Sequence, residues 1–552
     1  MKHPLLAVGF SFTFLLPSAA LAQEHKHSAD HTLGQVTFAT GCNAAAQKQM
    51  NTAVAMLHSF WLVEARKTFE AAAQADPACG IAHWGVALTH FGNPFGGGPG
   101  PEGLKAGLAA AEKGVAVGGK TPRDQAYVNA ALALYKDYET VDSRTRMRAY
   151  GEALKQIAAQ NPDDVESQIF AAFWMVPNAS ALDLTFADQK KAADVLNPLF
   201  KKYPQHPGLA HYIIHAFDSP PLAQLALDAA TRYAAIAPDA PHALHMPSHT
   251  FTRLGHWDES IKTNRRAADL EPTAGAKAHP ADYMVYAYLQ KGQDDAARKV
   301  LTEVGINPTG VDGTGAVWVG SYNAVAMAAR FALERNDWQA ATELSVPTNQ
   351  PAFIQSIARF ARALGHAQQG HVAPARDEIA ELAKLTNVLI ERKDPYWPIV
   401  TDAQRMAAEA WVLHHEGKHA EALAMAAQAA DKEETVEKHP VTPGPLIPAR
   451  ELLGDILMVH GKHAEALAAY EQTMKKEPNR LRTLAGAAAA ADKAGQKDVA
   501  LKYRAQIKKL IDPASPRAKM LLGAMWYDFE KFAVQYFAER AYEKYKWEPW
   551  KK

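Results

Sequence analysis

The chain has 552 residues with 59 Lys plus Arg and 59 Asp plus Glu, so its formal net charge is zero. A molecule with balanced charge has no long-range field that attracts nucleic acid or an anionic membrane surface, and we expect neither as a partner. Since 48% of the residues are hydrophobic, the chain can bury a large core, either in several domains or in one body of stacked repeats.

The N-terminus has the features of a secretory signal peptide. A positively charged start precedes an apolar run from Leu5 to Leu16, and Ala20-Leu21-Ala22 forms a cleavage pattern. The apolar run is too short to serve as a stable membrane anchor. We therefore expect a signal peptide over residues 1–22, cleavage after Ala22, and a periplasmic or secreted protein. Residues 23–40, which contain three histidines, read as a flexible leader.

Residues 41–205 read as N-terminal helical repeats with a Gly/Pro-rich insertion at 91–103. Cys42 precedes the first helix of the first repeat and Cys79 opens the first helix of the second, which places both at the same end of neighbouring parallel helices. Because disulfides persist in exported proteins, we expect these two cysteines to form one. A free reactive or metal-binding pair is the alternative.

A phosphate-loop pattern occurs at Gly114 to Thr121, with the sequence GVAVGGKT. That motif needs a preceding strand and a helix that begins inside it. The flanking segments here are helical, and Thr121-Pro122 has the signature of an N-cap followed by the first residue of a new helix. The match is therefore rejected.

Histidines recur at regular spacing in residues 206–300. His211 and His215 lie four residues apart, as do His245 and His249, and the two pairs are 34 residues apart. Four residues make about one helical turn, so each pair lies on one face of a helix. A shift of 34 residues, one whole helical repeat, places the two pairs side by side. Imidazole is the commonest protein metal ligand, and repeat packing does not require histidine at these positions.

Pro247 lies within the second of these helices. A proline inside a helix removes one backbone hydrogen bond and bends the chain, so we expect the helix to be kinked or to restart there. A break in a helix that carries candidate metal ligands favours a functional role for this segment. The alternative is that the break is a simple irregularity of the repeat.

The remaining chain reads as middle repeats over 301–438 and as C-terminal repeats and terminal helices over 439–552. The sequence GKHAEALA occurs at Gly417 to Ala424 and again at Gly461 to Ala468, each time at the turn between paired helices. Residues 439–448, HPVTPGPLIP, form an irregular insertion. No stretch has the alternation and hairpin turns of β-strands, so we expect an all-α fold.

A zinc-protease pattern, H-E-x-x-H, occurs at His415 to His419. Its chemistry requires both histidines on one face of a continuous helix, with the glutamate as base. Gly417 interrupts the helix at a repeat turn, and the second copy of the turn lacks the glutamate. The zinc-protease reading is rejected.

The repeats resemble the tetratricopeptide repeat family, with its small, aromatic and proline positions at Gly454, Gly461, Ala466, Tyr470 and Pro478. This resemblance implies a right-handed superhelical solenoid of paired antiparallel helices. The chain also resembles secreted bacterial tetratricopeptide proteins that carry two specific segments. These are HPGLAHYIIHAFD and APHALHMPSHTFTRLG, at residues 206–218 and 240–255.

The resemblance implies which residues face the concave groove of the solenoid. In three successive first helices, these positions include His211, His215, His242, His245, His249, His279, Asp282 and Tyr286. Asp218 and Arg253 fall at later groove positions, and Arg330 aligns with a groove position of the following repeat. A mixture of imidazole, carboxylate and phenol suits Zn, Cu, Fe or Ni better than Ca or Mg.

Two hypotheses follow for the function. In the first, the six histidines and Asp282 bind one or two transition-metal ions, with three histidines available for each of two ions, and support hydrolytic or oxidative chemistry. Asp218, Arg253, Tyr286 and Arg330 would contact a ligand. In the second, the groove binds a peptide or protein partner without catalysis, the usual role of this fold. The fold alone does not choose between them, and no catalytic residue is assigned.

Overall fold

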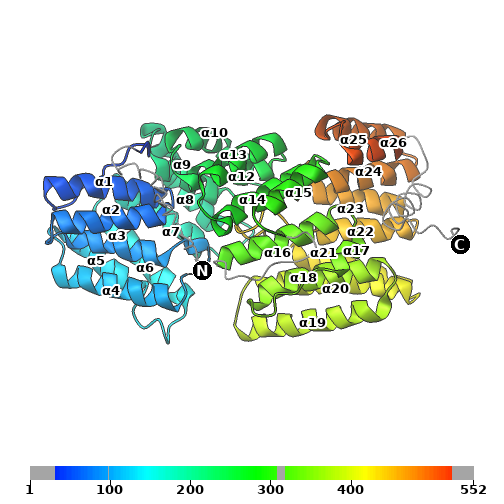
Figure 1. The fold of residues 1–552 in the computed structure, drawn as a ribbon, viewed down its shortest axis with the longest axis horizontal. Helices are drawn as coiled ribbons and strands as arrows, with labels where there is room; N and C mark the ends of the chain where they lie inside the picture. The colour runs from blue at the N-terminus through cyan, green and yellow to red at the C-terminus, as the bar shows by residue number, and fades with distance from the viewer. Residues whose placement is uncertain (1–30, 97, 307–317, 525–552) are drawn as a thin grey trace, which may run out of the picture.

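The computed structural model describes residues 31–96, 98–306 and 318–524, and this part of the chain is helical without a β-strand. Helices that follow one another along the chain pack in antiparallel pairs and stack into an all-helical solenoid (Figure 1). The predicted signal peptide and residues 23–30 of the predicted leader lie outside the described residues. Residues 31–40, expected to be flexible, instead pack against the repeats, and Phe38 is fully buried. Within the described chain, no helix is long and apolar enough to cross a membrane.

The helices follow one another in three groups, which Figure 1 shows in blue, green and yellow to red. The N-terminal group comprises α1 (Ala44–His58), α2 (Leu62–Ala75), α3 (Gly80–Phe91), η2 (Pro94–Gly96), α4 (Pro101–Val117), α5 (Pro122–Ala133), α6 (Ser143–Gln160), α7 (Val165–Asn178) and α8 (Ala187–Lys202). The middle group comprises α9 (Pro207–Ala216), η3 (Ala223–Ala226), α10 (Leu227–Ile236), α11 (Pro241–His245), α12 (Pro247–Arg253), α13 (Trp257–Leu270), α14 (Ala274–Gln290), α15 (Asp294–Glu303), α16 (Trp318–Leu333) and α17 (Trp338–Thr342). The C-terminal group comprises α18 (Ala352–Gln368), α19 (Val372–Glu391), α20 (Trp397–His415), α21 (His419–Glu433), α22 (Ala449–Val459), α23 (His463–Lys476), α24 (Leu481–Lys493), α25 (Lys497–Leu510) and α26 (Pro516–Ala524).

Glycines with positive φ end the first helix of successive repeats. They are Gly255, Gly292, Gly370, Gly417, Gly461 and Gly495, with φ between 68° and 77°. A residue without Cβ adopts this left-handed conformation at little cost, which lets the chain reverse into the second helix. The turn at Gly417 also separates His415, the last residue of α20, from His419, the first residue of α21. The two histidines therefore do not lie on one continuous helix, as the sequence predicted.

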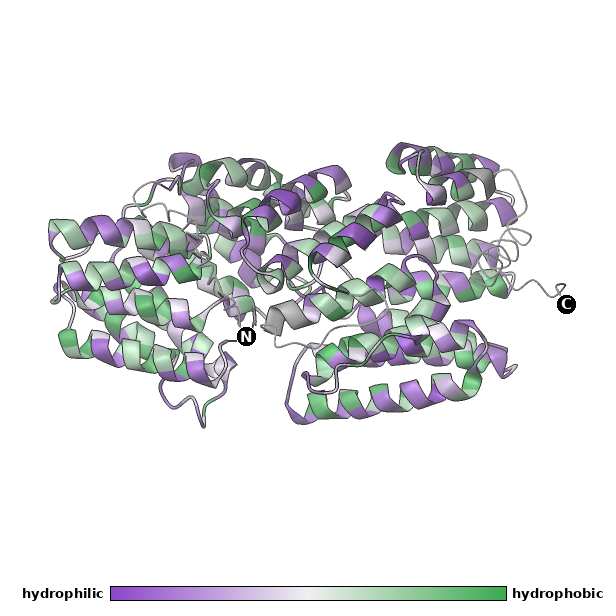
Figure 2. Ribbon diagram, viewed as in Figure 1, coloured by the Kyte–Doolittle hydropathy of each residue, from purple (hydrophilic) through white to green (hydrophobic). Residues whose placement is uncertain are grey.

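The solenoid is held together by small and apolar residues where helices meet. Hydrophobic and hydrophilic residues alternate along many of the helices (Figure 2), whereas α9 is buried on all sides. Ala422 and Ala466, the equivalent positions of the two copied turns, are fully buried, and so is Ser260 at the corresponding position of an earlier repeat. A larger side chain at these positions would separate the paired helices.

The two cysteines form a disulfide between the first two repeats. Cys42 precedes α1 and Cys79 is the N-cap of α3, with the Cα atoms 5.2 Å apart. The bond closes a loop of sequence separation 37. Among the described residues there is no free cysteine.

Reducing this disulfide, or replacing Cys42 and Cys79 with alanine, should lower the free energy of unfolding by about 4 kcal/mol on the chain-entropy model. The physical reason is the greater freedom of the unfolded N-terminal repeats. Thermal denaturation with and without reductant measures the effect. An unchanged melting temperature of the reduced protein would contradict it.

The C-terminal repeats fold back against the histidine-rich middle repeats. The Trp257 indole donates to the carbonyl of Asn479 at 3.0 Å, and the backbone N–H of Leu481 donates to the side chain of Gln290 at 2.9 Å. Helices α14 and α24 are therefore in contact although they lie far apart in sequence. This return brings residues after α21 close to the predicted site.

The segment between α21 and α22, residues 434–448, is here called the inner loop because it packs against buried side chains of α12 and α16. Arg330 donates to the carbonyls of Gly444 and Pro445 at 3.2 and 2.9 Å, and Arg253 donates to the carbonyl of Pro443. Both arginines are almost fully buried. The irregular sequence of residues 439–448 thus forms a packed part of the interior.

Candidate metal centre

Four helices position the six predicted histidines. His211 and His215 lie on α9, His242 and His245 on α11, His249 on α12, and His279 on α14. Helix α11 ends at His245 and α12 begins at Pro247, so the proline interrupts the helix as its sequence predicts. The break lies between His245 and His249, whose side chains nevertheless remain together.

The six histidines form two adjacent groups of three. In the first triad, His211, His215 and His242, one ring nitrogen from each residue lies within 4.8 Å of the others. The same holds in the second triad, His245, His249 and His279. The triads touch, because the rings of His215 and His249 have centroids 6.0 Å apart and those of His242 and His245 5.8 Å.

Hydrogen bonds fix the tautomers of two rings in the second triad. His245 Nδ1 lies 2.6 Å from Asn264 Oδ1, and the Asn264 amide nitrogen donates to the carbonyl of Ser260 at 2.7 Å, which fixes the orientation of the amide. His249 Nδ1 lies 2.8 Å from Asp218 Oδ2. Because both partners are acceptors, each Nδ1 carries the proton and each Nε2 has a free lone pair.

These two lone pairs face each other. His245 Nε2 and His249 Nε2 are 2.9 Å apart, yet neither neutral ring has a proton there to donate. Burial lowers the pKa of both imidazoles, to about 4 for His245, which disfavours a shared proton. Two metal–nitrogen bonds of about 2.0–2.1 Å at the tetrahedral angle place the nitrogens about 3.3 Å apart, so a separation of the two rings by about 0.4 Å admits a cation. A metal cation bound by both nitrogens fits this geometry.

The first triad is enclosed by aromatic rings. Phe95, from the insertion after α3, stacks on His215 with centroids 4.2 Å apart, and Phe60 stacks on His242 at 5.1 Å. His211 Nδ1 lies 2.6 Å from the carbonyl of His58, so its Nε2 is also unprotonated, 3.1 Å from His242 Nε2. Neither ring nitrogen of the buried His215 has a hydrogen-bond partner, and leaving such a group unsatisfied costs about 1–3 kcal/mol.

One carboxylate lies beside the second triad and is shared. Asp218 Oδ2 accepts from His249 and, at 2.7 Å, from the ammonium of Lys438 in the inner loop. Burial lowers the pKa of Lys438 to about 8, although Asp218 opposes that shift. Asp218 thus lies where an outer-shell carboxylate holds a metal-binding imidazole in its tautomer.

Burial lowers the pKa of all six histidines, to about 3 for His211 and about 4 for His245, so the rings are neutral at pH 7. In the unfolded chain a histidine titrates near pH 6.5. Below that pH the unfolded state binds protons that the folded state excludes, and stability is lost as the pH falls toward the folded pKa values.

The metal-free protein should therefore be less stable at pH 5 than at pH 7, by about 2 kcal/mol for each of His211 and His245. Thermal denaturation of chelator-treated protein at the two pH values measures this. The His211→Ala variant should show a weaker dependence, and equal melting temperatures at both pH values for the wild type would contradict the prediction.

Of the other predicted site residues, Asp218 lies beside the second triad, and the structure places Asp282, Arg253, Arg330 and Tyr286 apart from both triads. Asp282 lies outside both; it is fully buried and pairs with Arg330 Nε at 3.2 Å and with Asn323. Arg253 is paired with Glu477 at 2.9 Å. In the described structure the two predicted arginines therefore anchor the inner loop and balance buried carboxylates.

Tyr286 also faces away from the histidines. Its hydroxyl contacts Glu477 and Arg480, both at 3.3 Å. Tyr283 takes the place beside the triad, with its ring centroid 5.0 Å from His245 and its hydroxyl 3.3 Å from His249 Nδ1. Tyr283 follows His279 by four residues on the continuous helix α14, so the two share a face.

A second buried group lies beneath the first triad and was not predicted. The carboxylate of Glu166 contacts His58 Nε2 and His206 Nε2, each at 2.9 Å, and the three side chains are buried. Both imidazoles hold the pKa of Glu166 at about 2, against the effect of burial. The group is linked to the triad because the His58 carbonyl accepts from His211.

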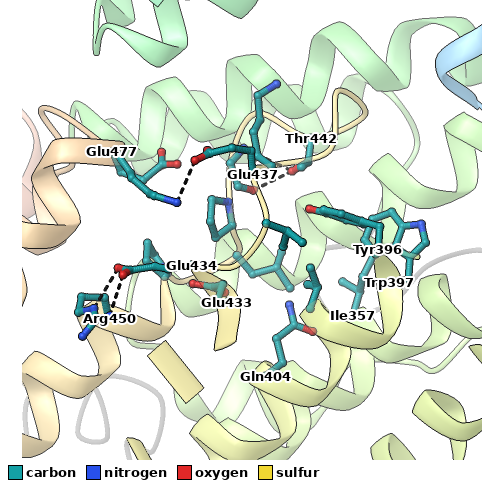
Figure 3. A pocket seen from close by; sticks show the side chains of 18 of the residues that line it. Ile357, Tyr396, Trp397, Gln404, Glu433, Glu434, Glu437, Thr442, Arg450 and Glu477 are labelled. Carbon is teal, nitrogen blue, oxygen red and sulfur yellow. Dashed lines mark hydrogen bonds and ion pairs between the residues drawn. The ribbon is translucent and has the colours of Figure 1, made fainter. Parts of the chain in front are cut away.

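A cavity of about 940 Å³ opens beside the two triads. Its lining includes Phe95, His215, Asp218 and Lys438 together with polar residues before α6 and after α7. A small cavity of about 80 Å³ is lined by Tyr396, Trp397 and Glu433 (Figure 3), and it shares Tyr396, Trp397 and Lys438 with the larger one. Only the larger cavity touches a predicted metal ligand.

No family model and no curated protein matches the chain. Among solved structures, it is similar to the human IFIT1 dimer with m7Gppp-AAAA, at 12% identity over 78% of this chain and 90% of that chain, with a TM-score of 0.39. It is also similar to the APC/C heterotetramer Cut9-Hcn1, at 12% identity over 75% of this chain and 76% of that chain, with a TM-score of 0.34. These similarities concern the helical-repeat fold alone.

Proposed function

We propose that this protein binds two transition-metal ions in adjacent sites, one in each histidine triad. The observation that carries the proposal is the pair of facing lone pairs on His245 and His249, 2.9 Å apart. Without a cation between them this contact is repulsive, and burial opposes a proton there. The unpartnered ring of His215 supports the same conclusion for the first triad.

The ligand set favours metals that bind imidazole, namely Zn, Cu, Fe or Ni. Neither triad contains a carboxylate, which argues against Ca and Mg. Three protein ligands leave a further coordination position open on each ion, as in catalytic zinc sites. An ion held in this way activates bound water at neutral pH or, if it is redox-active, exchanges electrons with a substrate.

The residues beside the triads suit chemistry at the edge of the 940 Å³ cavity. His215 would hold an ion where a substrate in the cavity reaches it. The Lys438 ammonium, anchored by Asp218, would bind an anionic group of that substrate. We therefore propose hydrolytic or oxidative chemistry on a small molecule that enters this cavity.

A scaffold that binds a peptide in the same groove is less well supported. The inner loop already contacts two of the predicted groove residues, since Arg330 donates to the carbonyls of Gly444 and Pro445 and Arg253 to that of Pro443. A partner would have to displace this loop from buried arginines.

Elemental analysis of untagged protein, purified without chelators, tests the proposal. We expect about two equivalents of a transition metal, as three-histidine sites predict, and loss of both in a variant with alanine at His211 and His245. Substoichiometric metal that the variant retains unchanged would overturn the proposal.

A further inference from the structure

A third group of histidines lies far from the metal centre, at the turns of the copied repeats. His414 is in the last turn of α20, His419 begins α21, and His460 is the C-cap of α22. One ring nitrogen from each lies within 4.8 Å of the others. His414 Nδ1 and His460 Nε2 are only 3.1 Å apart. We call this group the outer triad.

The repeat architecture explains why these three residues meet. His419 belongs to the first GKHAEALA turn, and His460 directly precedes the second. Helices α21 and α22 pack against each other, so the start of one lies beside the end of the other. His463 is the equivalent of His419 in the second copy. It begins α23, in the following repeat, and lies outside the group.

The surroundings permit a cation to bind. His419 is exposed, and His414 and His460 are half-buried, so an ion can enter from solvent without rearrangement of the core. The nearby lysines are neutralised, because Lys418 pairs with Glu416 at 3.0 Å and Lys462 with Glu465 at 2.8 Å.

The spacing of the rings also suits a metal ion. Nitrogens bound tetrahedrally at about 2.0–2.1 Å lie about 3.3 Å apart. The 3.1 Å contact between His414 and His460 already matches this value. The exposed ring of His419 needs only a side-chain rotation to complete three ligands.

We propose that the outer triad is a separate, solvent-exchangeable site for one transition-metal ion of the Zn²⁺, Ni²⁺ or Cu²⁺ class. An ion bound there joins the repeat of α20 and α21 to that of α22 and α23, and so stabilises the C-terminal part of the solenoid. This site is independent of the proposed function, because it shares no residue with the inner triads.

Retention of the untagged protein on immobilised Ni²⁺, compared between variants, tests this site, because the inner triads are buried and the contribution of other surface histidines is the same in every variant. We expect the wild type to be retained and the double variant H419A/H460A to elute at an imidazole concentration at least about 10-fold lower, since changes around metal ligands alone alter affinity 10- to 100-fold. The matched control H463A removes a histidine of the same copied turn and should elute like the wild type. Equal elution of H419A/H460A and H463A would overturn the proposal.

A second measurement covers the case in which the double variant is misfolded. In the H211A/H245A background, in which neither inner triad keeps three histidines, Zn²⁺ should still raise the melting temperature by mass action, with or without H463A. This shift should be lost when His419→Ala is added, a change at an exposed side chain. An undiminished shift after His419→Ala would contradict the site.

Discussion

Replacing His245 with alanine should release the ion of the second triad and leave the ion of the first triad bound. His245 provides one of two facing nitrogens in its triad, and Asn264 holds its ring in the metal-binding tautomer. Removal of one of three ligands should weaken binding by at least about 100-fold, the upper range seen when only an outer-shell partner is lost. Elemental analysis should then give about one equivalent of metal instead of two.

The fold should survive this change. Because His245 is buried and bonded to Asn264, its removal should lower the free energy of unfolding by about 1–3 kcal/mol, but the circular dichroism spectrum of the folded variant should remain that of the wild type. His256→Ala is the matched control, because His256 lies on the same stretch of chain but is exposed at a turn and belongs to neither triad. Loss of helicity in His245→Ala would show that this histidine is structural, and full metal content would show that it is not a ligand.

Replacing Arg330 with methionine should have the largest effect on stability. The fully buried guanidinium neutralises Asp282 and holds three groups of the inner loop, at Thr442, Gly444 and Pro445. Removing one partner of a buried ion pair costs about 3–5 kcal/mol because the remaining charge has no compensation. The midpoint of urea denaturation should fall accordingly.

A second change separates the ion pair from the loop contacts. In the double variant R330M/D282N no uncompensated carboxylate remains, so part of the lost stability should return while the inner loop stays unanchored. Lys438, which reaches Asp218 from this loop, should then become accessible to amine-modifying reagents. A loss of less than about 1 kcal/mol in R330M, the range of an exposed ion pair, would contradict the role assigned to Arg330.

The repeat period predicts that the histidine pairs lie side by side, but it does not predict which three histidines form each triad. A 34-residue shift relates His211 and His215 to His245 and His249, and the structure places these pairs side by side. His242 and His279 occupy the same position in two successive repeats. His242 completes the first triad, and His279 completes the second. The turn glycines and the break at Pro247 were also predictable, since each depends on local backbone chemistry.

Contacts between distant segments were not predictable in the same way. Lys438 and Phe95 reach the site from irregular loops, which have no period to align. Asp282 and Tyr286 were assigned to the groove from repeat positions alone, yet their partners come from α16 and from the C-terminal repeats that fold back on α14. The i, i+4 relation of His279 and Tyr283 was the one local signal that could have identified the nearer tyrosine.

Anomalous X-ray diffraction from crystals of the untagged protein, recorded on both sides of the absorption edge of the metal found by elemental analysis, is the most direct test of the central claim. Two strong peaks are predicted, one within about 2.0–2.1 Å of a ring nitrogen of His211, His215 and His242, and one at the same distance from His245, His249 and His279. Crystals with full metal content but no peak at either triad would contradict the account.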